Sequence, residues 1–225
     1  EKYPYRGEEA EAFRKAIDYA GRPVVLSLSL NMKLENKDHV KSISNVWRIS
    51  KDFWDEWEPL SHQFELLEKW TPSREPGNWP DADMLQLGWI SRRGPEGHER
   101  ESRFTEDEQY THFTLWCMAQ SPLMMGGDMP DNSRFVENLL TNEEVIYVNQ
   151  KARNARQLLR DNGKVIWISE DPASAARYVA FFNLNDLPAN IRLELSALGL
   201  RGKCSIRNLW QKKDLDPVKG TFTTS

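Results

Sequence analysis

The chain has 225 residues, of which 39% are hydrophobic and 28% charged, and its formal net charge is -4 at pH 7. Such a composition is that of a globular protein with one large domain or two modest ones. Charges of both signs are mixed along the sequence, which leaves no basic stripe for nucleic acid. No apolar run approaches the roughly 20 residues of a membrane helix. Binding to nucleic acid and insertion into a membrane are therefore not expected.

The cysteines and histidines do not form a metal-binding pattern. Cys117 and Cys204 are the only cysteines, and neither belongs to a Cys-x-x-Cys motif. The histidines are scattered without the spacing of a ligand set and lie at His39, His62, His98 and His112. We therefore expect neither a disulfide framework nor a structural metal ion.

The first part of the chain alternates predicted helices and strands. Residues 7–20 are expected to form an amphipathic helix, because Ala10, Phe13 and Ile17 recur at helical spacing before Gly21. A strand over residues 24–30 follows, with both faces expected to be buried. Further elements are expected as a helix at 38–44, a strand at 46–50, a helix at 53–70, an apolar run at 84–87, a helix at 105–119 and a strand at 122–125. This order predicts a parallel sheet built from βαβ units.

Beyond about Gln150 the pattern changes to short strands separated by turns. Strands are expected at residues 165–168, 178–184, 191–195 and 204–210. Their spacing is typical of an antiparallel β-domain. We therefore predict two domains, residues 1–150 and residues 151–225.

Three polar side chains occur at alternate positions at the end of the second predicted strand. Two-residue alternation places Arg48, Ser50 and, just past the strand, Asp52 on one side, facing one cavity. In a parallel α/β barrel the C-terminal strand ends carry the catalytic residues, so these groups predict a site. Alternatively, Ser50 or Asp52 could cap the helix that follows and have no catalytic role.

A second polar segment lies at residues 77–85, with the sequence G-N-W-P-D-A-D-M-L. It places the carboxylates of Asp81 and Asp83 and the indole of Trp79 beside a Gly/Pro turn. Aromatic faces pack on the C–H surfaces of sugars, and carboxylates accept hydrogen bonds from hydroxyls, so the segment suits a carbohydrate. The same residues could also form a solvated turn around a buried tryptophan.

Three segments in this order resemble glycoside hydrolase family 27, the melibiase-type α-galactosidases. They are V-W-R-I-S-K-D-F-W at residues 46–54, the segment at 77–85, and S-P-L-M-M-G-G-D at 121–128. Residues 139–150 also resemble the family's exit from its barrel into a β-domain. The resemblance implies an α/β fold, namely the second half of a (β/α)8 TIM barrel, followed by a C-terminal antiparallel β-sandwich domain that is incomplete here. It implies no cofactor.

The resemblance also assigns roles to individual residues. Asp52 matches the family's general acid/base, and Arg48 matches an arginine that binds a sugar hydroxyl near the scissile bond. Asp83 and Met84 match residues that line the galactose pocket. The implied function is a retaining glycoside hydrolase that cleaves terminal α-linked galactose from oligosaccharides or glycoconjugates. Asp52 would protonate the leaving oxygen and then deprotonate water, and burial beside a second carboxylate is expected to help it hold its proton.

The nucleophile of such an enzyme is missing from this sequence. The family carries it in a Lys-x-Asp motif at the end of the fourth barrel strand, and no such strand precedes Glu1. The chain is therefore expected to supply the acid/base half of a site that a longer protein completes. A noncatalytic carbohydrate-binding or assembly role is the alternative if the chain is the whole gene product.

Ser29 bears on which sugar would be bound. In the family, α-galactosidases tend to carry Glu after the fifth strand, whereas α-N-acetylgalactosaminidases carry Ser, and Ser29 matches that position. A smaller side chain would leave room for an N-acetyl group. We predict an α-galactoside substrate on the breadth of the family, with α-N-acetylgalactosaminidase as the alternative. The sequence does not indicate the compartment, and it is compatible with a homo-oligomer.

Overall fold

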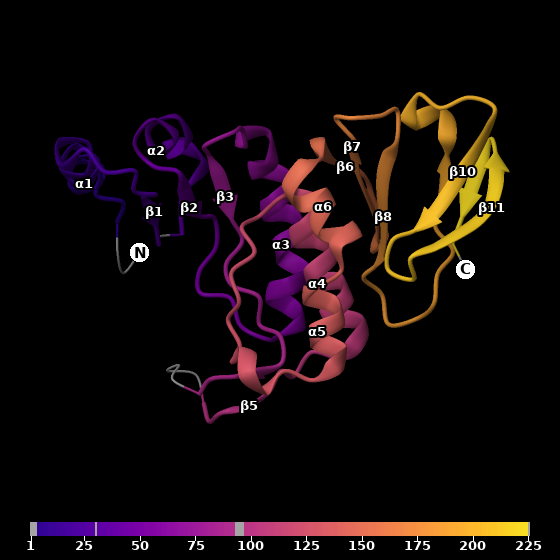
Figure 1. The fold of residues 1–225 in the computed structure, drawn as a ribbon, viewed down its shortest axis with the longest axis horizontal. Helices are drawn as coiled ribbons and strands as arrows, with labels where there is room; N and C mark the ends of the chain where they lie inside the picture. The colour runs from indigo at the N-terminus through magenta and orange to yellow at the C-terminus, as the bar shows by residue number, and fades with distance from the viewer. Residues whose placement is uncertain (1–3, 30, 93–96, 225) are drawn as a thin grey trace.

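The computed structural model describes residues 4–29, 31–92 and 97–224. Figure 1 shows a small sheet with its helices at the N-terminal end, a central group of helices, and antiparallel strands at the C-terminal end. In this part of the chain, no helix is long and apolar enough to cross a membrane. The elements up to residue 151 are α1 (Gly7–Ala20), β1 (Ser27–Leu28), α2 (Lys37–Ile43), β2 (Val46–Arg48), α3 (Trp57–Trp70), β3 (Trp79–Asp81), β4 (Trp89–Ile90), β5 (Arg100–Glu101), α4 (Glu106–Ala119), α5 (Arg134–Leu140) and α6 (Glu143–Lys151).

The sheet that carries the site consists of β1, β2 and β3 in that order, all parallel. Trp47 of β2 pairs with Pro80 of β3, and Arg48 pairs with Asp81. Farther along the chain, Leu85 forms an isolated parallel bridge with Met125. Parallel pairing with helices between the strands confirms the predicted βαβ units.

Strand lengths in this sheet differ from the prediction. The strand expected over residues 24–30 is reduced to β1, and residue 30 lies outside the described residues. Val24 and Val25 are 45% and 67% exposed, so the expectation that both faces are buried is wrong for this chain. Among the described strands β1 pairs with β2 alone, so no neighbour covers its other edge. The sequence does not predict β3, because Pro80 has no N–H to donate to a strand ladder.

The long helix expected from residue 53 begins at Trp57 instead. The four residues before it form a loop that tertiary contacts hold. Phe53 is buried, and the fully buried carboxylate of Asp55 accepts hydrogen bonds from Arg100 at 2.8 Å and from the backbone N–H of Arg103 at 2.7 Å. Those contacts join residues far apart in sequence, and local helix propensity does not reveal them.

Helix α4 lies at the centre of the fold and confirms the helix predicted there. Its N-terminus has a capping box, in which the Thr105 hydroxyl accepts from the Glu108 N–H and the Glu108 carboxylate accepts from the Thr105 N–H. The antiparallel strands pack against α3 and α4. Phe64 of α3 lies edge-to-face on Phe182 at 4.9 Å, and the core is therefore continuous from the helices into the strands.

The C-terminal part of the chain consists mainly of strands, namely β6 (Arg153–Asp161), β7 (Lys164–Glu170), β8 (Arg177–Asn183), β9 (Arg192–Glu194), β10 (Lys203–Asn208), β11 (Lys213–Lys219) and β12 (Thr221–Thr223). They form three antiparallel groups, with β6, β7 and β8 in one sheet, β9 paired with β12, and β10 with β11. The four predicted strands correspond to β7–β10. The sequence does not predict β6, β11 and β12, because charged residues interrupt the apolar alternation of the first two and the third is short.

Candidate active site

A cleft of about 690 Å³ opens at the C-terminal ends of the parallel strands. Side chains from just past β1, β2 and β3 contribute to it, together with two later loops. The five residues to which the family resemblance gives a role, namely Arg48, Asp52, Asp83, Met84 and Ser29, all line this cleft. Its lining consists of Ser29, Arg48, Asp52, Phe53, Trp54, Asp83, Met84, Gln86, Trp89, Ile90, Ser91, Arg92, Gly126, Gly127 and Asp128.

Arg48 links two carboxylates of the cleft. It is the last residue of β2, and only 9% of its side chain is exposed. Its Nη2 lies 2.7 Å from Oδ2 of Asp83 and 3.2 Å from Oδ1 of Asp52. A guanidinium always carries its charge, so Arg48 gives the floor of the cleft a fixed cation with paired counter-charges.

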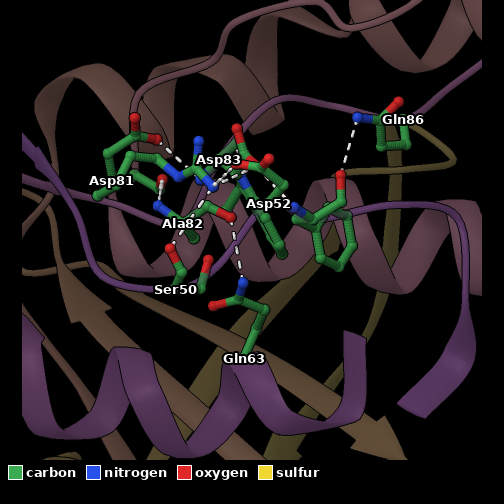
Figure 2. Close-up of polar contacts among 11 residues, drawn as sticks. Ser50, Asp52, Gln63, Asp81, Ala82, Asp83 and Gln86 are labelled. Atoms are coloured by element: carbon green, nitrogen blue, oxygen red, sulfur yellow. Dashed lines mark hydrogen bonds and ion pairs between the residues drawn. The ribbon is translucent and has the colours of Figure 1, made fainter. Parts of the chain in front are cut away.

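Asp83 is held in a fixed position by both its side chain and its backbone. Its carboxylate accepts a hydrogen bond from the Phe53 N–H at 2.7 Å, and its carbonyl accepts one from the Trp116 indole at 2.7 Å. Its φ of 84° is in the left-handed region, which Asp tolerates better than most residues. Figure 2 shows Asp83 beside Asp52, with Asp81 to the left of the pair. Contacts from several sides therefore hold Asp83, the partner of Arg48, in place.

Asp81 is a buried carboxyl that supports this turn without lining the cleft. Its Oδ1 accepts a hydrogen bond from the Asp83 N–H at 2.9 Å. Burial raises the pKa of the Asp81 carboxyl, while that hydrogen bond and the charge of Arg48 oppose the rise. The residue thus acts as a support for Asp83.

Asp52 lies at the mouth of the cleft, and 85% of its side chain is exposed in this chain. The expectation that it is buried is therefore wrong for the described residues. Asp55 is buried in this loop and does not line the cleft, whereas Asp52 and Trp54 line it. The alternative role as a helix cap is also wrong, because α3 begins at Trp57 and its N-cap, Glu56, makes no side-chain cap.

Ser50 does not face the cleft, although strand alternation predicts that it does. It is buried, and its hydroxyl has no hydrogen-bond partner among the described residues. The prediction fails because β2 ends at Arg48, and the two-residue alternation ends with it. Met84 and Ser29 line the cleft as exposed residues of its rim.

Amide side chains fasten the loops beneath the site. Gln86 donates to the Phe53 carbonyl at 2.9 Å, and Gln63 donates to the Ala82 carbonyl at 3.2 Å. Figure 2 shows Gln63 below the Asp52–Asp83 pair and Gln86 to its right. Ser121 accepts from the Ala82 N–H at 3.0 Å. The loops that carry Asp52 and Asp83 are therefore preorganised by buried hydrogen bonds.

Several residues that line the cleft are not predicted from the sequence to belong to the site. Trp54 and Asp128 belong to recognised segments, but their positions give no sign of a shared cleft. Trp89 and Arg92 lie outside those segments, Trp89 within β4 and Arg92 just after it, and the sequence does not predict the antiparallel pairing of β4 with β5. These residues meet only because distant loops fold together.

Comparison with known proteins identifies the family. Residues 5–151 match the family model described as "Alpha galactosidase A", and residues 161–225 match that of the "Alpha galactosidase C-terminal beta sandwich domain". The chain belongs to glycoside hydrolase family 27, the melibiase family. The resemblance stated from the sequence is thus confirmed, and the chain is a part of this TIM-barrel family with its C-terminal β-sandwich domain.

Solved structures and curated relatives agree with this assignment. A family 27 β-L-arabinopyranosidase from Geobacillus stearothermophilus is 42% identical with a TM-score of 0.96, covering 100% of this chain and 52% of that one. An Asp-to-Ala variant of that enzyme, solved with arabinose, is 43% identical at the same TM-score and coverage. The rice "Alpha-galactosidase" is 31% identical over 173 residues, which are 75% of this chain and 38% of the relative. "Alpha-galactosidase 2" of Arabidopsis thaliana is 27% identical, over 91% of this chain and 50% of the relative. This chain therefore spans about half the length of the relatives it matches, or less.

Proposed function

We propose that this chain supplies the acid/base half of the active site of a retaining glycoside hydrolase. In this proposal residues 1–150 form the second half of the (β/α)8 barrel and residues 151–225 the antiparallel β-sandwich domain that packs against it. Asp52 is the general acid/base, and Arg48, Asp83, Met84 and Ser29 contact the sugar. The observation that carries the proposal is Arg48 at the tip of β2, between the carboxylates of Asp52 and Asp83 in one cleft.

The exposure of Asp52 suits the acid/base role. A general acid must reach the glycosidic oxygen, and Asp52 projects from the mouth of the cleft; among the described residues its one charged contact is with Arg48 at 3.2 Å. Retaining glycosidases place their two carboxyl groups about 5–5.5 Å apart, on either side of the anomeric carbon. A nucleophile that approaches Asp52 from the open side would complete the site and help it hold a proton.

The nucleophile is proposed to come from the rest of the protein. Two other carboxylates line the described part of the cleft, and arginines bind both of them. Asp83 is paired with Arg48 and also accepts the Phe53 N–H, while Asp128 is paired with Arg92. A carboxylate whose oxygens already accept charge-assisted hydrogen bonds is a poor nucleophile. The two engaged aspartates are therefore better suited to binding and support.

The substrate is proposed to be a terminal pyranose with the configuration of α-D-galactose. Arg48 and Asp83 together offer a donor and an acceptor for ring hydroxyls at the cleft floor. Curated relatives named α-galactosidase support α-linked galactose. With Ser29 exposed at the rim, room for an N-acetyl group keeps N-acetylgalactosamine as an alternative.

A β-L-arabinopyranoside has this same ring configuration, and one observation favours it over an α-D-galactoside. Identity to the Geobacillus β-L-arabinopyranosidase is 42% over the whole chain, against 31% over 173 residues for the rice α-galactosidase. The β-L-arabinopyranosyl ring matches α-D-galactopyranosyl in its hydroxyl groups and lacks only the CH2OH at C5. One site can therefore accept both rings, and the higher identity favours the arabinopyranoside as the better substrate.

A single experiment tests the function and ranks the sugars. The full-length protein is assayed with nitrophenyl α-D-galactopyranoside, β-L-arabinopyranoside and N-acetyl-α-D-galactosaminide, and NMR follows the anomer released first. We expect turnover of the first two, with retention of configuration and the higher kcat/KM for the arabinopyranoside. Release of the opposite anomer would exclude the retaining mechanism. A preference for the N-acetylated substrate would overturn the ranking, and absence of all turnover would overturn the proposed function.

A further inference from the structure

Five residues that line the cleft have no part in the chemistry proposed above. They are Trp54, Trp89, Ile90, Arg92 and Asp128, and we call this set the Trp89 wall. Trp54 lies two residues past Asp52, and the others come from the segment at β4 and from the loop after Met125. Trp54 therefore connects the wall to the loop of the proposed acid/base.

The Trp89 wall is built on two segments in close backbone contact. The Asp128 N–H donates to the Trp89 carbonyl at 2.6 Å, and the Gly126 N–H donates to the Leu85 carbonyl at 2.9 Å. A Cβ on Gly127 would lie only 2.2 Å from the Leu87 carbonyl oxygen. Glycine is therefore needed for this approach, and the wall has a fixed position relative to the sheet.

The charged part of the wall is an arginine surrounded by carboxylates. Arg92 binds Glu99 through Nε at 3.0 Å, Asp131 through Nη2 at 2.5 Å, and Asp128 through Nη1. The hydrogen bonds that Arg92 donates to Glu99 and Asp131 raise the pKa of its guanidinium, so its charge is retained. Its nitrogens are directed at these carboxylates, which leaves the cation poorly placed to bind an anionic ligand. The carboxylate oxygens can still accept hydrogen bonds from hydroxyls.

The apolar part of the wall offers aromatic surface to the cleft that Asp52 also lines. Trp54 and Trp89 are both half-buried and line the cleft. The Trp89 indole N–H points to Glu99 at 3.5 Å, which joins the ring to the Arg92 cluster. Indole faces pack well on the C–H face of a pyranose, and carboxylates beside them suit its hydroxyls.

We propose that the Trp89 wall is a leaving-group subsite that accepts a neutral sugar and disfavours an acidic one. The inference rests on the proposed function, because a general acid at Asp52 donates to the oxygen that joins the cleaved sugar to its leaving group. With the cleaved sugar on Arg48 and Asp83, the leaving group lies on the far side of that oxygen. The wall then contacts the leaving sugar.

The test compares a substrate that has a leaving sugar with one that does not. The full-length protein and its Trp54→Ala and Trp89→Ala variants are assayed with the glycosyl fluoride of the preferred sugar and with that sugar linked to glucose. We expect kcat/KM on the disaccharide to fall about tenfold while kcat/KM on the fluoride stays within about twofold. Retained fluoride turnover also shows that each variant folds. Trp54→Phe should restore most of the loss, and Trp57→Ala, outside the cleft, should leave the ratio of the two substrates unchanged.

Two outcomes would overturn the subsite. Equal losses on the disaccharide and the fluoride would mean that the tryptophans only support the fold or the catalytic loop. If the wild type had the same kcat/KM for substrates with glucose and with glucuronic acid as the leaving group, the preference for a neutral sugar would be refuted. Where the preference exists, added salt should weaken it, because salt screens the repulsion between carboxylates. If the wild type hydrolysed neither the fluoride nor the disaccharide, the proposed function itself would be refuted. Failure of the function and failure of the subsite therefore give different results.

Discussion

Asp83 binds Arg48 through a 2.7 Å ion pair while its own backbone adopts a φ of 84°. The left-handed conformation turns the chain after β3, so that the carboxylate faces Arg48 and the carbonyl faces the indole of Trp116. The same carboxylate accepts the N–H of Phe53, the neighbour of Asp52. One residue therefore couples the loop of the proposed acid/base to the strand that carries the sugar-binding arginine.

Breaking this ion pair should lower the free energy of unfolding more than breaking an exposed ion pair does. Arg48→Ala leaves the buried Asp83 carboxylate without its cation, so we expect the free energy of unfolding to fall by about 3–5 kcal/mol. Urea denaturation of the full-length protein measures the change. Arg6→Ala is the matched control, because Arg6 and Glu9 are paired at 2.8 Å but are 68% and 63% exposed. The free energy of unfolding of Arg6→Ala should fall by less than about 1 kcal/mol. Similar losses for both variants would contradict the coupling role of Arg48.

Asp52→Asn should affect activity and not stability. The side chain is largely exposed and does not cap α3, so the free energy of unfolding should change by less than about 0.5 kcal/mol. Loss of a general acid should lower kcat on an unactivated disaccharide by about 10²–10⁴-fold. Asp38→Asn is the control, since Asp38 is 93% exposed in α2 and outside the cleft. Near-normal turnover of the disaccharide by Asp52→Asn would remove Asp52 from its proposed role.

Much of the scaffold around the site follows from local pattern. Helical spacing before Gly21 predicts α1, and the helix predicted over residues 105–119 corresponds to α4. Strand β2 is also predicted, over residues 46–50, and it ends two residues earlier, at Arg48. Such elements are visible in sequence because the interactions that define them are only a few residues apart.

The finer geometry of the site depends on contacts that no local pattern contains. Ser50 leaves the cleft because β2 ends two residues earlier, and residues 53–56 form a loop because Asp55 binds distant arginines. Strand β3 forms despite Pro80 because its parallel neighbour β2 supplies the pairing. The Trp89 wall could not be predicted, since Gly127 and Trp89 meet only in the folded chain.

His112 should make the protein less stable in acid. Its ring is fully buried against Phe53 and Trp116, and neither ring nitrogen has a hydrogen-bond partner among the described residues. Burial lowers its pKa from 6.5 to about 3. The unfolded chain therefore binds a proton that the folded chain does not, and this contribution to stability is present above pH 6.5 and is lost as the pH falls toward 3.

His112→Phe should remove that part of the pH dependence. Phenylalanine fills the aromatic site and has no proton to bind, so we expect the variant to gain up to about 3 kcal/mol relative to wild type between pH 7 and pH 4. Denaturation curves at both values measure the difference. His62→Phe, at a side chain that is 58% exposed, should show no comparable gain. Parallel pH profiles for wild type and His112→Phe would show that His112 does not titrate with folding.

Gly127→Ala should separate the two segments beneath the Trp89 wall. The added Cβ would lie 2.2 Å from the Leu87 carbonyl oxygen and 3.0 Å from that of Trp89, and backbone atoms cannot rotate away. We expect a loss of about 1–3 kcal/mol in the free energy of unfolding, which thermal denaturation can follow. Gly126→Ala is the graded control, because its closest contact, the Leu85 carbonyl oxygen, lies at 3.0 Å and requires a smaller shift. If Gly126→Ala proved the more damaging of the two, the close backbone approach at Gly127 could not be what fixes the wall.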